Sequence, residues 1–188
     1  MHVPALVAEE ACKIARTSEA NGVIAIGGGS TIGLAKIVAL RTELPIVAVP
    51  TTYAGSEMTS IFGITEGGVK KTGRDARVMP RAVIYEPRLT LELPLSISVT
   101  SAINAIAHAV EGLYAPDATP LLTIMAQEGI AATVRAISRM YQSPRDLQAR
   151  GDALYGAWLC ASVLGNVSMA LHHKLCHTLG GSFDLPHA

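Results

Sequence analysis

The spacing of apolar residues changes once along this chain, near Pro94, and that change constrains the fold more than any other feature. Before it, short apolar runs alternate with stretches of helical periodicity. The runs lie at 23–26, 46–49 and 82–85, and the helical stretches at 5–20 and 31–40. Runs of this length suit strands buried on both faces, and their alternation with helices predicts a parallel sheet covered on both faces. We therefore expect an α/β domain over residues 1–94.

Beyond Pro94 the sequence shows helical periodicity and no convincing strand. The candidate helices cover residues 98–114, 120–141, 144–164 and 168–179. We therefore expect a helical domain over residues 95–188, so that the fold class is α/β followed by all-α. The α/β part offers about three strong strands, fewer than the roughly five or six of an average sheet. The chain also ends at Ala188, beside a histidine cluster. Both features predict a fragment of a longer protein.

The composition excludes several classes of function. Apolar residues make up 49% of the chain and charged residues 16%, which is typical of a soluble globular protein with a sizeable core. Fifteen basic side chains balance fifteen acidic ones, so we expect no general attraction to nucleic acid or to a membrane surface. Cys12, Cys160 and Cys176 form no CxxC pair, which favours reduced thiols. Without a secretory signal or an apolar membrane span, the sequence predicts a cytoplasmic protein.

A run of glycines joins the first apolar strand to the helix that follows it. Residues 27–30 read Gly-Gly-Gly-Ser. Glycines let a backbone approach a ligand closely, and the free N–H groups of a helix N-terminus attract phosphate. An ordinary tight turn is the alternative, but three successive glycines exceed what a turn requires. The loop therefore predicts a pyrophosphate site, although it is not the GxGxxG motif of a standard Rossmann fold.

A second polar loop follows the next strand. Residues 50–57 read Pro-Thr-Thr-Tyr-Ala-Gly-Ser-Glu. In open α/β sheets, ligands bind beyond the carboxyl ends of the strands, where hydroxyl groups can donate hydrogen bonds to phosphate or ribose. Taken alone, this segment is better explained as a cap for the following helix. Two such loops after two strands nevertheless favour a nucleotide site.

Most of the six histidines gather in the predicted helical domain. Asn104 and His108 are four residues apart and share a helix face, as do His173 and His177, and His187 follows His173 by fourteen residues. This spacing suits a three-histidine metal site or a cluster of proton donors. For the remaining histidines, His2 and His172, a surface or core position is the better explanation.

Together these motifs resemble the iron-containing (group III) alcohol dehydrogenase family. The matching segments are Gly27–Ser30, Pro50–Thr52, Lys71–Gly73, Asn104-x-x-x-His108, and His173-x-x-x-His177 with His187. The resemblance implies a dehydroquinate synthase-like architecture, in which a Rossmann-like parallel sheet domain binds NAD(P), a helical domain follows, and catalysis takes place in the cleft between them. Here the sheet domain would be partial and the helical domain truncated. The implied cofactor-binding residues are Gly28, Gly29, Ser30, Thr51, Thr52, Ser56, Lys71 and Leu89.

The resemblance also implies a metal site, from which this sequence departs. The family's Asp and three His ligands fall on Asn104, His108, His173 and His187. Asn104 replaces the only anionic ligand, and a neutral amide with three imidazoles would hold divalent iron poorly. We therefore expect no metal; if one is bound, the three histidines are its ligands. Gly33 likewise stands where Asp is common in the glycine motif.

Both departures, together with residues 100–114, match one branch of the family. That branch reduces maleylacetate to 3-oxoadipate with NADH or NADPH, without a metal, in the breakdown of aromatic compounds. Maleylacetate is a small dianion, and hydride addition places negative charge on its ketone oxygen, to which Asn104 can donate a hydrogen bond. We expect His177 to return the proton, and His108, His173 and His187 to bind carboxylate or enolate oxygen. The resemblance further implies a homodimer of the full-length protein.

Two alternatives stay open. One is a metal-dependent alcohol dehydrogenase of the same family, against which Asn104 argues. The other is a catalytically silent fragment that only folds or associates. The sequence does not distinguish NADH from NADPH, because the residues that contact the ribose are expected upstream of Met1.

Overall fold

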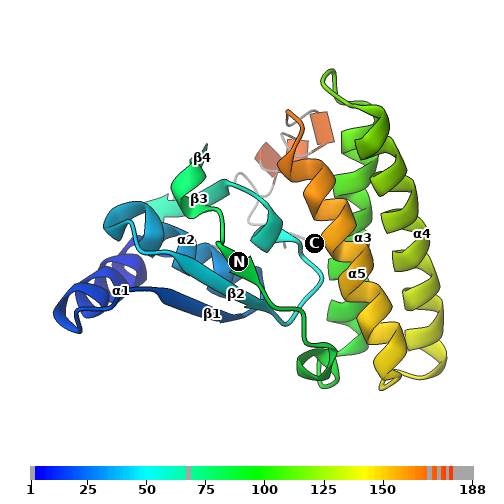
Figure 1. The fold of residues 1–188 in the computed structure, drawn as a ribbon, viewed down its shortest axis with the longest axis horizontal. Helices are drawn as coiled ribbons and strands as arrows, with labels where there is room; N and C mark the ends of the chain where they lie inside the picture. Colours follow the sequence, from blue (N-terminus) through cyan, green and yellow to red (C-terminus); the bar gives the residue numbers. More distant parts are fainter. Residues whose placement is uncertain (1–2, 67–68, 169–170, 173–174, 177, 180–188) are drawn as a thin grey trace.

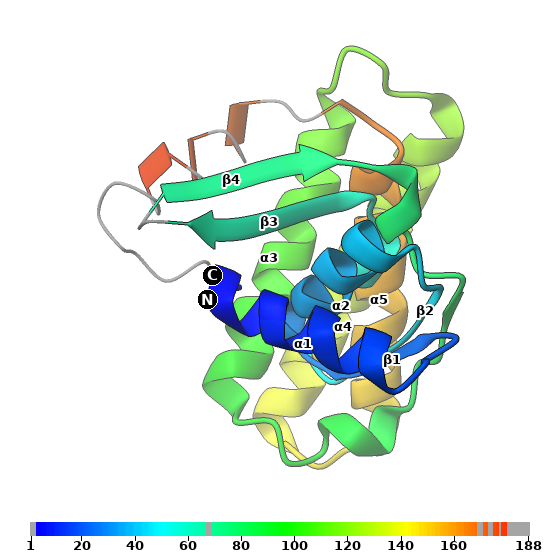
Figure 2. The same ribbon diagram turned by 90° about the vertical axis from the view of Figure 1, so that its left-hand side faces the viewer.

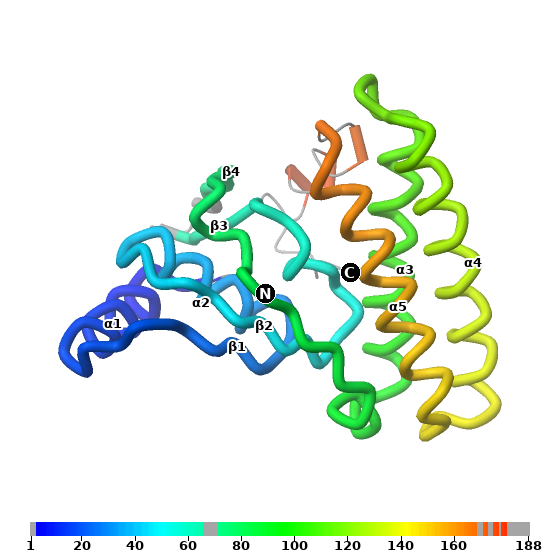
Figure 3. The backbone as a smooth tube through the Cα atoms, in the orientation of Figure 1, coloured from blue at the N-terminus to red at the C-terminus, as the bar shows by residue number. Residues whose placement is uncertain are grey.

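The computed structural model describes residues 3–66, 69–168, 171–172, 175–176 and 178–179. An α/β part and a three-helix part stand side by side in it, and the tube in Figure 3 follows the chain from one to the other. This arrangement confirms the predicted fold class (Figure 1). The division into two domains at residues 94 and 95 stays a prediction.

The elements follow one another in the order expected from the sequence, with additions between β2 and α3. The α/β part contains α1 (Ala5–Thr17), β1 (Val23–Gly27), α2 (Gly29–Thr42), β2 (Ile46–Pro50), η1 (Ser56–Met58), β3 (Ile61–Glu66), β4 (Val69–Arg74), η2 (Ala76–Val78), β5 (Ala82–Val83) and η3 (Pro87–Thr90). The helical part contains α3 (Leu95–Leu113), α4 (Pro120–Gln142) and α5 (Leu147–Gly165). None of the described helices is long and apolar enough to cross a membrane.

The parallel sheet positions the site. Its strand order is β1-β2-β5, and β1 pairs with β2 from Val23 opposite Ile46 to Gly27 opposite Pro50. The two strands therefore end together, and the loops that follow them leave from the same edge of the sheet. The third strand is shorter than the predicted 82–85, because only Ala82 and Val83 pair with β2.

The prediction that the sheet is covered on both faces is wrong for β1, although β2 beside it is largely buried. Neighbouring side chains on a strand point to opposite faces. In β1 the side chain of Ala25 is buried and packs with Ile32 on α2, whereas Ile24 and Ile26 are 71% and 59% exposed. Helix α2 therefore covers one face of β1, and the other face of this strand is open.

A β-hairpin between β2 and β5 was not expected from the sequence. Strands β3 and β4 pair antiparallel from Ile61 opposite Arg74 to Glu66 opposite Val69 (Figure 2). The second strand contains Lys70, Lys71, Thr72 and Gly73, and this polar composition hides its strand character. Tertiary contacts stabilise the hairpin, because Ile64 belongs to a small core with Val3, Ala8 and Ile37.

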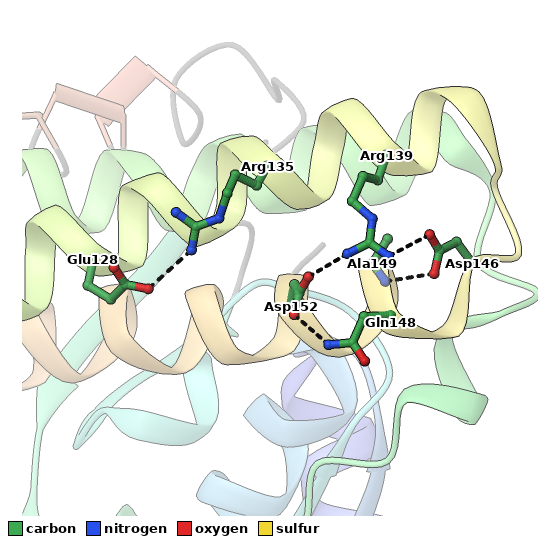
Figure 4. Close-up of polar contacts among 7 residues, drawn as sticks. All are labelled: Glu128, Arg135, Arg139, Asp146, Gln148, Ala149 and Asp152. Carbon is green, nitrogen blue, oxygen red and sulfur yellow. Dashed lines mark hydrogen bonds and ion pairs between the residues drawn. The ribbon is translucent and has the colours of Figure 1, made fainter.

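The three long helices pack closely because small residues lie at their crossings. A side chain at Gly156 on α5 would collide with Thr133 on α4, so these two helix backbones come close to each other. Helix α5 begins at a strong cap: Asp146 accepts a hydrogen bond from the backbone N–H of Ala149 at 3.1 Å. On α4, Arg139 bridges Asp146 and Asp152 at 2.9 and 3.0 Å (Figure 4).

The predicted helices of the second half agree with the structure to within a few residues. Helices α3, α4 and α5 correspond to the predicted 98–114, 120–141 and 144–164. Within the predicted helix 168–179, the described residues 171–172, 175–176 and 178–179 are helical.

Candidate active site

The two polar loops predicted to bind a nucleotide touch each other at the carboxyl edge of the sheet. The backbone N–H of Thr51 donates to the carbonyl oxygen of Gly27 at 3.0 Å. A Cβ on Gly28 would lie 2.9 Å from Cγ2 of Thr52, closer than real Cβ contacts, so glycine is required for this approach. Gly28, Thr51 and Thr52 are therefore brought together, as a shared ligand site requires.

The N-terminus of α2 opens directly at this contact. Gly28 is its N-cap, and no side chain caps the first turn, which contains Gly29, Ser30 and Thr31. A Cβ on Gly29 would meet only Ala54, at 3.6 Å. The N–H groups and dipole of this helix give the loop the capacity to hold an anionic group such as a phosphate.

The second loop extends from the sheet to the helical part. Gly55 has a φ of 77°, and a Cβ there would lie 2.5 Å from the Cβ of Ala161 on α5 and 3.4 Å from Nδ1 of His108 on α3. The loop therefore passes against α5 and reaches the imidazole of His108. A side chain at position 55 would both collide with α5 and strain the backbone.

Asn104 and His108 lie on one face of α3, one turn apart. Nδ2 of Asn104 lies 3.2 Å from Nε2 of His108, and His108 is buried while Asn104 is half-buried. The two side chains are therefore within hydrogen-bonding distance, and the tautomer of His108 sets which of its ring nitrogens donates. The pair offers neutral hydrogen-bonding groups and no anionic ligand.

Tyr53 anchors the second loop in the helical part, a role that the sequence analysis missed. Its side chain is fully buried in the helical core, and its hydroxyl accepts a hydrogen bond from Nη1 of Arg150 at 3.1 Å. The guanidinium of Arg150, also buried, donates to Oγ of Ser98 and to the carbonyl oxygens of Leu93 and Pro144. One arginine thus joins the loop, α3 and the α4–α5 turn.

A buried polar cluster behind the loop was also missed. The ammonium of Lys36, on α2, hydrogen-bonds to oxygens of Ser56, Thr59 and Ile61. Burial lowers the pKa of Lys36 to about 7, and the charge of Glu57 acts in the opposite direction. The only sequence signal was one lysine inside the apolar stretch Ile32–Leu40.

Glu57 and Tyr85 complete this buried cluster. Burial raises the pKa of the Glu57 carboxyl, which accepts a hydrogen bond from the Tyr85 hydroxyl at 3.1 Å. The pKa of Tyr85 is raised by burial and by the neighbouring Glu57. Both groups are therefore held in their neutral forms more strongly than they would be in water.

The other predicted site residues are more dispersed. Ser56 begins η1, Lys71 lies on β4 opposite Ile64, and Leu89 lies half-exposed in η3, so none of these three forms the contact between the two loops. His173, His177 and His187 lie outside the described residues, and their predicted roles stay predictions.

A side chain at Gly33 would come close to Val3. A Cβ at this position would lie 3.2 Å from Cγ2 of Val3, a buried residue at the start of the described chain. An aspartate would therefore press against an apolar neighbour, where its carboxylate would be poorly solvated.

Family models match both parts of the chain. Residues 1–87 match the model described as iron-containing alcohol dehydrogenase, and residues 98–188 match the Fe-containing alcohol dehydrogenase family, C-terminal. The chain is 99% identical over all 188 residues to the maleylacetate reductase of Pseudomonas knackmussii and 65% identical to that of Pseudomonas sp. strain P51. It covers 53% of each, so it spans about half the length of the curated relatives it matches.

Solved structures give the same result. A putative alcohol dehydrogenase from Ralstonia eutropha JMP134 superimposes with a TM-score of 0.98 at 61% identity, and maleylacetate reductase from Agrobacterium tumefaciens with 0.96 at 55% identity. Each comparison covers 100% of this chain and 53% of the other.

Proposed function

Because the chain belongs to the iron-containing alcohol dehydrogenase family, we propose that it forms the cofactor loops and part of the catalytic cleft of an enzyme that reduces maleylacetate with NADH or NADPH. The contact between the two loops, continued by Gly55 to the ring of His108, carries this proposal. This contact connects the N-terminus of α2, which is suited to a phosphate, to His108 and its neighbour Asn104, which are suited to the substrate. The 99% identity to a maleylacetate reductase supports the choice of substrate.

The cofactor lies across the carboxyl ends of β1 and β2 in this proposal. The N-terminus of α2, with Gly29 and Ser30, holds the pyrophosphate, and the hydroxyls of Thr51 and Thr52 donate to phosphate or ribose oxygens. The reduced nicotinamide, when bound, supplies the hydride. Lys71, Leu89 and Ser56 remain further candidates for cofactor contacts.

The substrate chemistry suits neutral donors. The hydride adds to the alkene carbon distant from the ketone, and the electrons of the double bond move to the ketone oxygen as an enolate. Asn104 and His108 donate hydrogen bonds to oxygens of this dianionic substrate. A proton then adds to the carbon beside the ketone, and His177 is the proposed donor. The product is 3-oxoadipate.

We further propose that this chemistry needs no resident metal, although the family is named for iron. Asn104 and His108 occupy two of the ligand-type positions, neither supplies an anionic group, and Nδ2 of Asn104 lies 3.2 Å from Nε2 of His108. Such a pair fits divalent iron poorly. If a metal is bound, His108, His173 and His187 are its ligands, and metal analysis of purified protein distinguishes the two cases.

The test uses a protein of the relatives' length that contains these residues. It is incubated with maleylacetate and NADH or NADPH carrying deuterium at both C4 positions. We expect 3-oxoadipate with one deuterium at the carbon distant from the ketone, identified by mass spectrometry and NMR. Unlabelled product, or no product while a relative in parallel turns over, contradicts the proposal.

A further inference from the structure

Lys36 holds both ends of the segment that joins the cofactor loop to β3. Its Nζ lies 2.6 Å from the carbonyl oxygen of Ser56, 2.7 Å from that of Thr59, 2.8 Å from that of Ile61, and 3.1 Å from Oγ1 of Thr59. The residue is fully buried, and it lies 20 to 25 positions before its partners in the sequence.

The position of Lys36 links the two halves of the candidate cofactor site. Helix α2 begins at Gly29 with the phosphate-binding turn and carries Lys36 two turns later. The oxygen of Ser56 that it binds belongs to the residue after Gly55, which lies against His108 and Ala161. Lys36 thus connects α2, whose N-terminus is the candidate phosphate site, to the loop that reaches His108 on α3.

Stability alone is a poor explanation for a buried lysine. Transfer of an ammonium group from water to a protein interior is costly, and an apolar residue of similar volume often stabilises a core as well or better. Among the described residues, the acidic group that acts on Lys36 is the carboxyl of Glu57, which is buried and accepts a hydrogen bond from the Tyr85 hydroxyl. The ammonium is satisfied mainly by loop carbonyls, so its specific effect is to fix the path of that loop.

We propose that Lys36 is a positioning residue for hydride transfer, which holds the β2–β3 loop so that Gly55 stays against His108 while α2 holds the cofactor. This inference rests on the proposed function. Without the ammonium, three carbonyl groups lose a buried donor, and the loop moves to hydrate them. A displacement of the loop then misaligns the nicotinamide and the groups on α3.

The test compares Lys36→Met with Ile37→Val, in a protein of the relatives' length. Ile37 is the next residue on α2, is equally buried, and packs on Val3 and Ile64 instead of the loop. Both variants are assayed at a temperature where circular dichroism shows them folded. We expect Lys36→Met to lower kcat by roughly 10- to 100-fold and to weaken NADH binding, because misplacement costs rate steeply. Ile37→Val keeps both within about twofold of the parent.

Two further measurements keep the proposal open to refutation. Hydrogen exchange should quicken at residues 51–59 in Lys36→Met and stay unchanged there in Ile37→Val. If Lys36→Met does not fold, Lys36→Gln, which retains neutral N–H donors, takes its place with a smaller loss expected. The inference is overturned if the Lys36 variant matches Ile37→Val in kcat, in NADH affinity and in hydrogen exchange at residues 51–59. Failure of the parent protein to bind NADH or NADPH overturns the proposed function instead.

Discussion

Gly29 is a residue at which the candidate cofactor site can be probed with little damage to the fold. A Cβ there would meet only Ala54 at 3.6 Å, in the first turn of α2. We predict that Gly29→Val abolishes NADH binding, because the branched side chain occupies the space of the pyrophosphate. Gly151→Val is the control, since a Cβ on this helical glycine meets only Pro87, also at 3.6 Å. Fluorescence titration that gives equal NADH affinity in both variants refutes the placement.

We expect Asn104 to determine whether this face of α3 favours the dianionic substrate or a divalent metal. We predict that Asn104→Asp lowers kcat/KM for maleylacetate roughly 10-fold or more, because a carboxylate beside a dianion repels it. The same change should raise the content of divalent metal in the purified protein, because it supplies an anionic ligand beside His108. Asn21→Asp, which adds the same charge at an exposed position, is the control. Unchanged kcat/KM in Asn104→Asp would count against the proposed role.

Among single residues, the sequence indicated those that local structure brings to one edge of the sheet. Gly28, Gly29 and Thr51 could be proposed because turn chemistry and strand ends are visible in a few consecutive residues, and their roles stay predictions. Lys36 and Arg150 were missed because their partners are distant: Arg150 lies 97 positions from Tyr53. In the sequence, Lys36 is one charged residue in the apolar stretch Ile32–Leu40, and Arg150 lies near the start of a largely apolar helix. Only the folded chain shows which oxygens accept their hydrogen bonds.

Helix α5 depends on its cap, which makes its stability sensitive to acid. The N–H of Ala149 lowers the pKa of the Asp146 carboxyl, and Arg139 adds to the effect (Figure 4). A depressed pKa stabilises the fold above the unfolded pKa and loses that effect as pH falls through the folded value. We predict that the melting temperature decreases as the pH is lowered below about 4. In Asp146→Asn, whose side chain can still cap α5, the decrease should be smaller. An identical fall in both proteins would show that Asp146 contributes nothing to it.

Among the elements, length and apolar periodicity decided what could be predicted. Helices α3, α4 and α5 repeat their apolar pattern over several turns, so their existence and approximate bounds were visible. The β3–β4 hairpin was missed because β4 is polar and contains two lysines, and because contacts of β3 with Val3 and Ile37, which are distant in the sequence, hold it in place. The open face of β1 was missed because an apolar run does not show which of its faces another element covers.

The molecule as a whole exposes large apolar side chains on several elements. Leu6 on α1, Ile24 on β1, and Leu121 and Ile124 on α4 are each more than 60% exposed. Contiguous apolar surface promotes association in water. The chain spans about half the length of its curated relatives, and the homodimer implied by the family resemblance stays a prediction.

We predict that residues 1–188, expressed alone, associate and reduce maleylacetate far more slowly than a protein of the relatives' length. Hydride transfer requires the two reacting carbon atoms to be held roughly 3–3.5 Å apart, and small misplacements lower the rate steeply. A chain of about half its relatives' length is expected to hold them less accurately. Light scattering and steady-state assays of the two proteins side by side measure both effects. A monodisperse 188-residue chain with comparable turnover would show that these residues suffice.

The substrate preference of the longer protein tests whether this site reduces maleylacetate without a metal. After treatment with a chelator, initial rates are measured for NADH or NADPH oxidation with maleylacetate and for NAD⁺ reduction with ethanol or propanediol. We expect maleylacetate to be reduced at an undiminished rate after the chelator treatment, and neither alcohol to be oxidised. Alcohol oxidation restored by iron or zinc, without reduction of maleylacetate, would contradict it.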